Sequence, residues 1–175
     1  ASHYGVDTRE IDLLDGSPMA VVGDTEHYSR TKAFIAKQDL SIARNYDHIQ
    51  TLIDADDFIE YQVAQIYFGN MDWPGDNIKY WRPKHAYGKW RWLLFDTDFG
   101  FAKWDYNPFS FNTPEFATEP DGPEWPNPPW STLFLRKLLE NTDFRRDFII
   151  RFATDLNTIF RPERVIDTIT RMQAA

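Results

Sequence analysis

Hydrophobic side chains recur at intervals of three and four residues over much of the chain, which predicts several amphipathic helices. Ser41 is a suitable N-cap for the first of them, whose apolar positions are Ile42, Tyr46, Ile49, Leu52 and Ile53. A second helix has capping-box spacing at Asp57 and Glu60 and is apolar nearly all round until Gly69, a residue that suits a helix end. A helix without a polar face is expected to lie buried near the centre of the fold.

The C-terminal third continues the helical pattern. Ser131 and Asp143 are expected to cap two helices, and Pro162 stands in the first turn of a third. Between residues 101 and 130 the chain holds seven of its eleven prolines, and no regular structure is expected there. This stretch should nevertheless be ordered, because its large aromatic rings can be buried: Phe101, Trp104, Phe109, Phe111, Trp125 and Trp130.

Two segments have the composition of strands. Residues 77–83 and 89–95 are rich in aromatic and β-branched side chains and flank a turn at residues 85–88, which predicts an antiparallel hairpin. Both of its faces carry rings, so it should lie under other elements. Residues 11–14 and 20–22 are shorter apolar pieces that predict edge strands. The expected fold class is α+β, mainly helical, with one buried hairpin near the middle.

Composition narrows the class of protein further. The 175 residues favour a single domain over residues 1–175, and the net charge of −8 argues against a nucleic-acid partner. The absence of cysteine excludes disulfides, thiolate metal sites and a cysteine nucleophile. No apolar run approaches the length of about 20 residues that a transmembrane helix needs, so no transmembrane segment is expected.

The residues with the most chemical potential flank the hairpin. If its turn is centred near residue 86, Asn77 lies opposite Phe95, and the loop from Asp72 to Asn77 meets the turn that contains Asp96 and Asp98. Taken singly, each of these side chains is a common turn or cap residue. Crowded together, however, their carboxylates need a cation or a basic partner, and oxygen ligands of this kind suit Mg²⁺.

The order of these residues is typical of one reaction. Asp-x4-Asn, then a hairpin, then Asp-Phe-Gly is the order of the catalytic loop and the metal-binding turn of protein kinases. In that chemistry the loop aspartate orients the attacking hydroxyl and takes its proton. The asparagine and the aspartate of Asp-Phe-Gly hold the metal against the nucleotide phosphates.

The segments YQVAQIYFGNMDWPGDNIKYW and GKWRWLLFDTDFGF resemble the signature of the CotH kinase family, which are atypical protein kinases. The resemblance is good over about residues 30–104 and loose over the C-terminal helices. It implies a protein-kinase-like C-terminal lobe, Mg²⁺ or Mn²⁺ with ATP as cofactors, and protein Ser/Thr as the acceptor. By position, Asp72 resembles the catalytic aspartate, Asn77 and Asp98 resemble the metal ligands, and Asp96 is the accompanying acid. An extracytoplasmic, cell-surface or spore-coat location is implied by the family alone.

Two departures from the kinase pattern qualify this interpretation. Asn70 and Met71 stand where ordinary protein kinases have His-Arg, and none of the eight glycines forms G-x-G. No strand with a phosphate-pairing lysine precedes the helices. The chain is therefore expected to be a C-terminal lobe without its nucleotide-clamping lobe, and inactive when isolated.

Two other functions stay open. Asp96-x-Asp98 also fits a metal-dependent glycosyltransferase, although such enzymes usually carry the motif in an alternating β/α domain, which this pattern lacks. A non-catalytic structural or surface-binding module would explain the missing half of the nucleotide site.

Overall fold

The computed structural model describes residues 5–101 and 110–174. The elements in these residues are a 3-10 turn Thr8–Glu10, the strands β1 Ile11–Asp15, β2 Met19–Val22, β3 Lys79–Pro83 and β4 Arg91–Leu93, and the helices α1 Glu26–Lys37, α2 Ala43–Leu52, α3 Ala55–Phe68, α4 Thr113–Thr118, α5 Pro129–Leu138, α6 Thr142–Leu156 and α7 Pro162–Gln173. This mixture confirms the α+β class. None of the described helices has the length and hydropathy needed to span a membrane.

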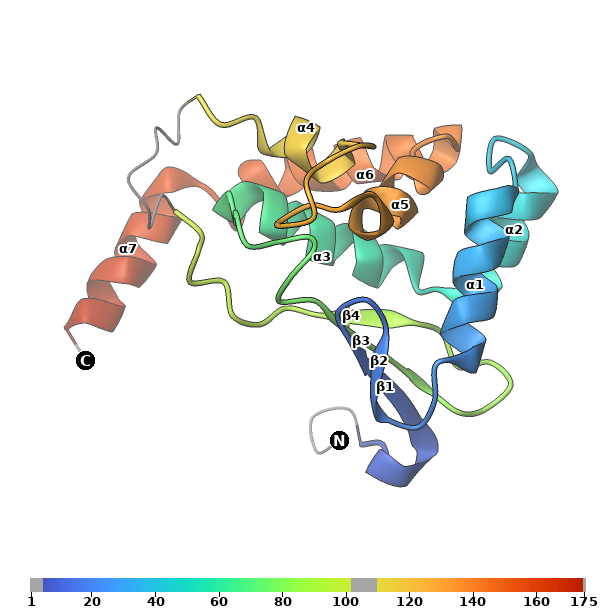
Figure 1. Cartoon of the computed structure of the whole chain (residues 1–175). Helices are drawn as coiled ribbons and strands as arrows, with labels where there is room; N and C mark the ends of the chain where they lie inside the picture. The colour runs from blue at the N-terminus through green and yellow to red at the C-terminus, as the bar shows by residue number, and fades with distance from the viewer. Residues whose placement is uncertain (1–4, 102–109, 175) are drawn as a thin grey trace.

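The four strands form one antiparallel sheet in the order β2-β1-β3-β4, which lies below α3, α5 and α6 in Figure 1. The predicted hairpin is confirmed, and its pairs, such as Lys79 with Leu93 and Trp81 with Arg91, are symmetric about residue 86. The hairpin is not an isolated ribbon, however. β1 pairs along the whole length of β3, so the N-terminal strands extend the same sheet, and β1 is a central strand rather than an edge.

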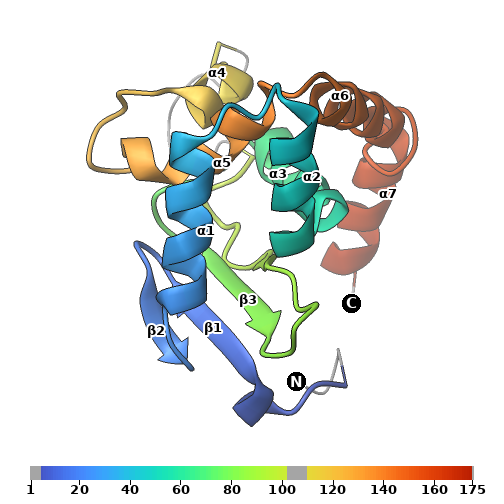
Figure 2. The same ribbon diagram turned by 90° about the vertical axis from the view of Figure 1, so that its right-hand side faces the viewer.

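One face of the sheet supports the main hydrophobic core. Tyr80 of β3 and Leu14 of β1 are completely buried beneath the helices. Tyr28 of α1 stacks on Tyr80 with ring centroids 4.3 Å apart and on Phe134 of α5 at 5.6 Å. In Figure 2, α1 crosses over the sheet with α2 beside it. Offset aromatic packing of this kind fixes the helices against the strands that carry the candidate loops.

α3 is the central helix, as its apolar pattern predicts, but its cap is not at Asp57. The N-cap is Asp54, whose carboxylate accepts the backbone N–H of Asp57 at 3.4 Å. The carboxylate of Asp57 instead accepts the backbone N–H of Trp92 at 2.8 Å and so ties α3 to the edge strand β4. At the other end, Gly69 adopts the left-handed conformation with φ 61°, which confirms the predicted helix stop.

Three other predicted caps are wrong by one to three residues: Ser41, Ser131 and Asp143. The N-cap positions belong to Ile42, Pro128 and Asn141. Of these, Asn141 caps with its side chain, because its Oδ1 accepts the backbone N–H groups of Asp143 and Phe144 at 2.9 and 3.1 Å. Pro162 begins α7 as predicted.

Two helices were not predicted. α1 buries a tyrosine, a threonine and a single isoleucine, which give only a weak apolar stripe. α4 lies within the proline-rich stretch and begins with Pro114 in its first turn, where a missing N–H costs nothing. In the described part of this stretch, Phe111 packs on Phe116 with ring centroids 5.1 Å apart, and Trp130 packs against the core. Phe101 and Trp125 are not buried as expected, because they are 61 % and 56 % exposed. Trp104 and Phe109 lie outside the described residues.

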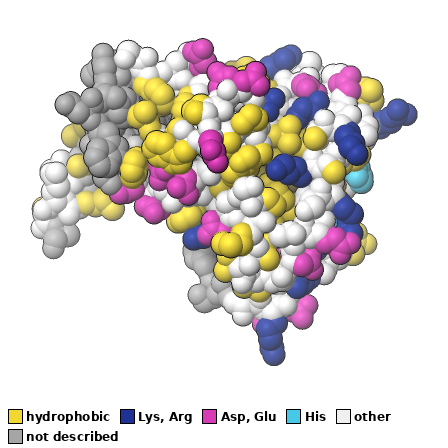
Figure 3. All heavy atoms as spheres, in the orientation of Figure 1, with side chains coloured by type: hydrophobic (Ala, Val, Ile, Leu, Met, Phe, Trp, Pro, Cys, Tyr) yellow, Lys and Arg dark blue, Asp and Glu magenta, His cyan; other side chains and the backbone are white. Residues whose placement is uncertain are grey.

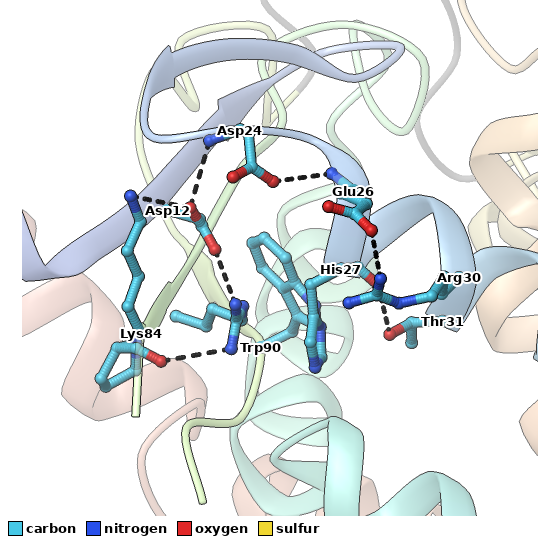
Figure 4. A network of polar contacts seen from close by, with 10 residues as sticks. Asp12, Asp24, Glu26, His27, Arg30, Thr31, Lys84 and Trp90 are labelled. Carbon is cyan, nitrogen blue, oxygen red and sulfur yellow. Dashed lines mark hydrogen bonds and ion pairs between the residues drawn. The ribbon is translucent and has the colours of Figure 1, made fainter. Parts of the chain in front are cut away.

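A buried ion cluster joins the sheet to the start of α1 (Figure 4). Asp12 of β1 is 1 % exposed, and its carboxylate meets the guanidinium of Arg82 at 2.9 Å and the ammonium of Lys84 at 3.5 Å. The same carboxylate accepts the backbone N–H of Asp24 at 3.1 Å. A side chain at Gly23 would come within 2.2 Å of Asp12 Oδ1, so only glycine allows this approach. Asp12 therefore fixes both the strand and the chain that enters α1.

Asp57 gives the sheet–helix contact a pH dependence. Burial raises the pKa of Asp57 to about 6, above its usual value of 3.8. The folded protein therefore binds a proton more tightly than the unfolded chain, and stability should fall as pH rises from about 4 to 6. We expect Asp57→Asn, which keeps an acceptor for the N–H of Trp92, to be more stable than the wild type at pH 7.5, by an amount on the order of 1 kcal/mol after discounting for partial exposure.

Urea unfolding at pH 4 and pH 7.5 measures this effect, and the gain should disappear at pH 4. Asp56→Asn is the matched control, because it removes an exposed acid from the same first turn of α3. It reports the loss of the favourable helix-dipole interaction that both substitutions share. Equal stability changes for the two variants at pH 7.5 would contradict the burial argument.

Candidate active site

The two candidate loops are joined at the end of α3. The backbone N–H of Phe101 donates to the carbonyl of Phe68, the last residue of α3, at 2.7 Å. The N–H of Gly100 closes the Asp-Phe-Gly turn on the carbonyl of Thr97 at 3.0 Å. A Cβ at Gly100 would lie only 3.0 Å from the Thr97 carbonyl oxygen and 3.1 Å from that of Phe68. Glycine in the Asp-Phe-Gly motif is thus explained by the close approach of the turn to α3.

Asn70, the residue that departs from the kinase pattern, is a structural support for the loop. It is fully buried, and its side-chain amide donates to Gln65 Oε1 of α3 at 2.9 Å. Its Oδ1 accepts the backbone N–H of Asp72 at 3.2 Å. The buried amide therefore connects the position of Asp72 directly to the central helix.

The carboxylate of Asp72 is held at both oxygens. Asp72 is 7 % exposed, and Oδ2 accepts a short hydrogen bond from the side-chain amide of Asn77. Oδ1 accepts the indole N–H of Trp125 at 3.1 Å. Asn77 adopts a positive φ of 49°, a conformation that asparagine tolerates better than most residues. Because its amide nitrogen faces Asp72, the amide oxygen of Asn77 is the atom left to ligate a cation.

The pKa of Asp72 reflects both its burial and the neighbouring acids. Burial is the main cause that raises the pKa of Asp72, and the hydrogen bond from Trp125 opposes it. The negative charges of Asp76, Asp96 and Asp98 raise the pKa of Asp72 further. The loop after α3 and the Asp-Phe-Gly turn thus meet at the open end of the hairpin, in the arrangement that its register about residue 86 predicts. The roles of Asp72, Asn77, Asp96 and Asp98 stay predictions.

Comparison with known protein families identifies the family of this chain. The family model described as CotH kinase protein matches residues 12–175. The chain belongs to the CotH kinase family. The resemblance that the sequence showed over residues 30–104 therefore extends through the sheet strand β1 and the C-terminal helices. No match is found among curated proteins or among solved structures.

Membership in the CotH kinase family indicates a kinase-type enzyme, and such enzymes generally use ATP with a divalent metal. In residues 5–101 and 110–174, no three His, Asp or Glu side chains are placed to hold a metal ion by themselves. The chemistry of the donor set is nevertheless suitable, because carboxylate and amide oxygens are the ligands of a hard cation. Mg²⁺ commonly keeps water and phosphate oxygens in its shell, so a few protein ligands fit a metal that arrives with a nucleotide.

Sequence patterns did not identify Trp125 as part of this site. The residue was expected as one of the rings that order the proline-rich stretch, or as part of an aromatic binding surface, and not as a partner of Asp72. It reaches Asp72 because the loop between α4 and α5 folds back over the loop after α3, where the backbone N–H of Gly75 donates to the carbonyl of Pro126 at 2.6 Å. Figure 3 shows hydrophobic side chains gathered around α4 and this loop, with acidic side chains among them. No short-range pattern links positions 72 and 125.

Proposed function

We propose that this chain carries the catalytic and metal-binding side chains of a protein kinase that transfers the γ-phosphoryl group of ATP to protein Ser/Thr. Asp72 is the catalytic acceptor of the hydroxyl proton, Asn77 and Asp98 are metal ligands, and Asp96 is a supporting acid. The observation that carries the proposal is the meeting of two segments: the loop in which Asn77 bonds to Asp72, and the Asp-Phe-Gly turn, where the N–H of Phe101 bonds to Phe68 at the end of α3. Asn77 contacts Asp72, and the charges of Asp96 and Asp98 act on the same carboxylate.

In the proposed reaction, Asp72 accepts a hydrogen bond from the Ser or Thr hydroxyl of the acceptor. The hydroxyl oxygen forms a bond to the γ-phosphorus while the bond to the bridging oxygen of ADP breaks, and the hydroxyl proton passes to Asp72. A bound Mg²⁺ would neutralise charge on the phosphate oxygens. Positioning is nearly all that such a protein contributes, and the supports of Asp72 supply it.

The crowding of carboxylates gives a reason for cation dependence. Burial is the main cause of the raised pKa of Asp72, and repulsion from the charges of Asp76, Asp96 and Asp98 adds to it. A divalent cation between Asn77 and Asp98 would relieve this repulsion. The same argument explains why nucleotide without metal should bind poorly, since ATP itself is an anion.

The test is phosphate transfer from γ-labelled ATP by the full-length natural protein, with dephosphorylated casein as acceptor and with EDTA as the metal-free control. We expect label on Ser or Thr that requires Mg²⁺ or Mn²⁺. The isolated residues 1–175 should bind Mg-ATP weakly and transfer little, because no phosphate-covering G-x-G turn occurs in their sequence. Absence of both transfer and calorimetric nucleotide binding in the full-length protein would favour the non-catalytic module. Transfer of sugar from a nucleotide-sugar diphosphate would favour the glycosyltransferase.

A further inference from the structure

Only one of the two donors that hold the Asp72 carboxylate comes from the kinase-like motif. Asn77 belongs to the Asp-x4-Asn segment, whereas Trp125 comes from the loop between α4 and α5, 53 positions along the chain from Asp72. The two N–H groups bond to different oxygens of the same carboxylate. The contact with Trp125 therefore adds a second hydrogen bond to the carboxylate, which the motif alone does not supply.

The backbone that carries Trp125 is firmly placed. The carbonyl of Pro126 accepts the N–H of Gly75 at 2.6 Å, and a Cβ at Gly75 would lie 2.4 Å from both that oxygen and Pro128 Cδ. Asn127 is 2 % exposed and donates to the carbonyl of Phe116 in α4 at 3.1 Å. By contrast, the Trp125 side chain is 56 % exposed. An anchored backbone with an exposed ring indicates that the indole is there for its contact with Asp72 rather than for the core.

We propose that Trp125 is a positioning residue for Asp72, which fixes the orientation of the carboxylate before the acceptor hydroxyl arrives. This inference rests on the proposed kinase function. A carboxylate with one donor on each oxygen cannot rotate about its Cβ–Cγ bond without breaking both hydrogen bonds. Each oxygen keeps a further lone pair, so the acceptor hydroxyl can still bond to it. Loss of one donor leaves the carboxylate held by Asn77 alone, and fewer molecules then have the productive geometry.

Trp125→Phe separates the hydrogen bond from the ring, because phenylalanine keeps an aromatic side chain and lacks the N–H. In the full-length protein we expect Trp125→Phe to lower kcat about tenfold, as for the loss of one positioning hydrogen bond, and to change the KM for ATP less than about twofold. Trp130→Phe is the control, since Trp130 lies nearby in the chain but packs against the core. A merely structural role would give loss of folded protein and no selective fall in kcat.

The contact itself has a spectroscopic test in residues 1–175 that does not depend on activity. The chain has seven Trp, and the indole N–H resonance of Trp125 is the one that disappears in Trp125→Phe. Asp72→Ala should shift this resonance more than any other indole N–H. An unmoved Trp125 resonance, or an unchanged kcat in an active Trp125→Phe enzyme, overturns the inference alone. A wild type that neither binds Mg-ATP nor transfers phosphate overturns the proposed function, and with it the catalytic meaning of the contact.

Discussion

Asp12→Ala is expected to lower the free energy of unfolding by about 3 kcal/mol, because it removes the partner of a buried charge. The guanidinium side chain of Arg82 is 13 % exposed and meets Asp12 at 2.9 Å. Alanine would leave this cation desolvated and unpaired, and would also remove the acceptor for the backbone N–H of Asp24. Figure 4 shows that the cluster lies where β1 approaches the start of α1. Because it joins the sheet to a helix, its loss should lower the stability of the whole domain.

Asp15→Ala is the matched control for this prediction. Asp15 lies on the same strand, and its ion pair with Lys79 at 3.4 Å is about a third exposed on both sides. An exposed pair of this kind contributes less than about 1 kcal/mol. Urea unfolding followed by tryptophan fluorescence compares the two variants. Equal losses would show that the buried cluster has no special importance for stability.

A double variant distinguishes the loss of the pair from a general loss of packing. When Asp12→Leu is combined with Arg82→Met, the buried charge is removed together with its partner. Replacement of a buried pair by apolar side chains is often neutral or stabilising. We expect the double variant to recover the part of the loss that comes from the unpaired Arg82, but not the part that comes from the lost acceptor of the Asp24 N–H. A double variant as unstable as the single one would assign the effect to packing around β1.

The hairpin register could be predicted because it depends on local information. Two aromatic-rich segments flank one short turn, and antiparallel pairing then fixes which residues oppose each other, as Lys79 and Leu93 do. That register alone brings Asn77 toward the Asp-Phe-Gly turn. The pairing of β1 with β3 joins segments more than 60 residues apart and is decided by tertiary packing, which no short pattern encodes.

Errors at helix ends have a similar origin. Ser, Asp and Asn are all good caps, so several candidates near one helix start cannot be ranked from their identity alone. At α6 the N-cap is Asn141 rather than Asp143, and Asn141 is the buried residue of the two. Asn141 is 4 % exposed, and its amide also donates to the carbonyl of Leu40, which links α6 to the loop before α2. Trp125 could not be predicted as a partner of Asp72, because their contact exists only once two distant loops have packed together.

Asp72→Asn is expected to lower kcat for phosphate transfer in the full-length protein by about 10²- to 10⁴-fold, because asparagine cannot take the hydroxyl proton. The side chain keeps its size and can keep one of its two hydrogen bonds, so the loop should retain its shape. Binding of Mg-ATP should change less than about twofold, since Asp72 is not among the proposed metal ligands. A large fall in kcat with unchanged nucleotide binding is the signature of a proton acceptor.

The most direct test of the account is therefore the turnover of Asp72→Asn beside that of Asp76→Asn, with calorimetric titration of Mg-ATP for both. Asp76 is an exposed acid of the same loop, and its Oδ1 accepts the backbone N–H of Asn77 at 2.9 Å, a bond that asparagine preserves. Both variants lose one negative charge at nearly the same place. We predict that Asp72→Asn loses at least a hundredfold in kcat while Asp76→Asn stays within about threefold of the wild type. Equal turnover in the two variants, with unchanged nucleotide binding, would contradict the assignment of Asp72 as the catalytic residue.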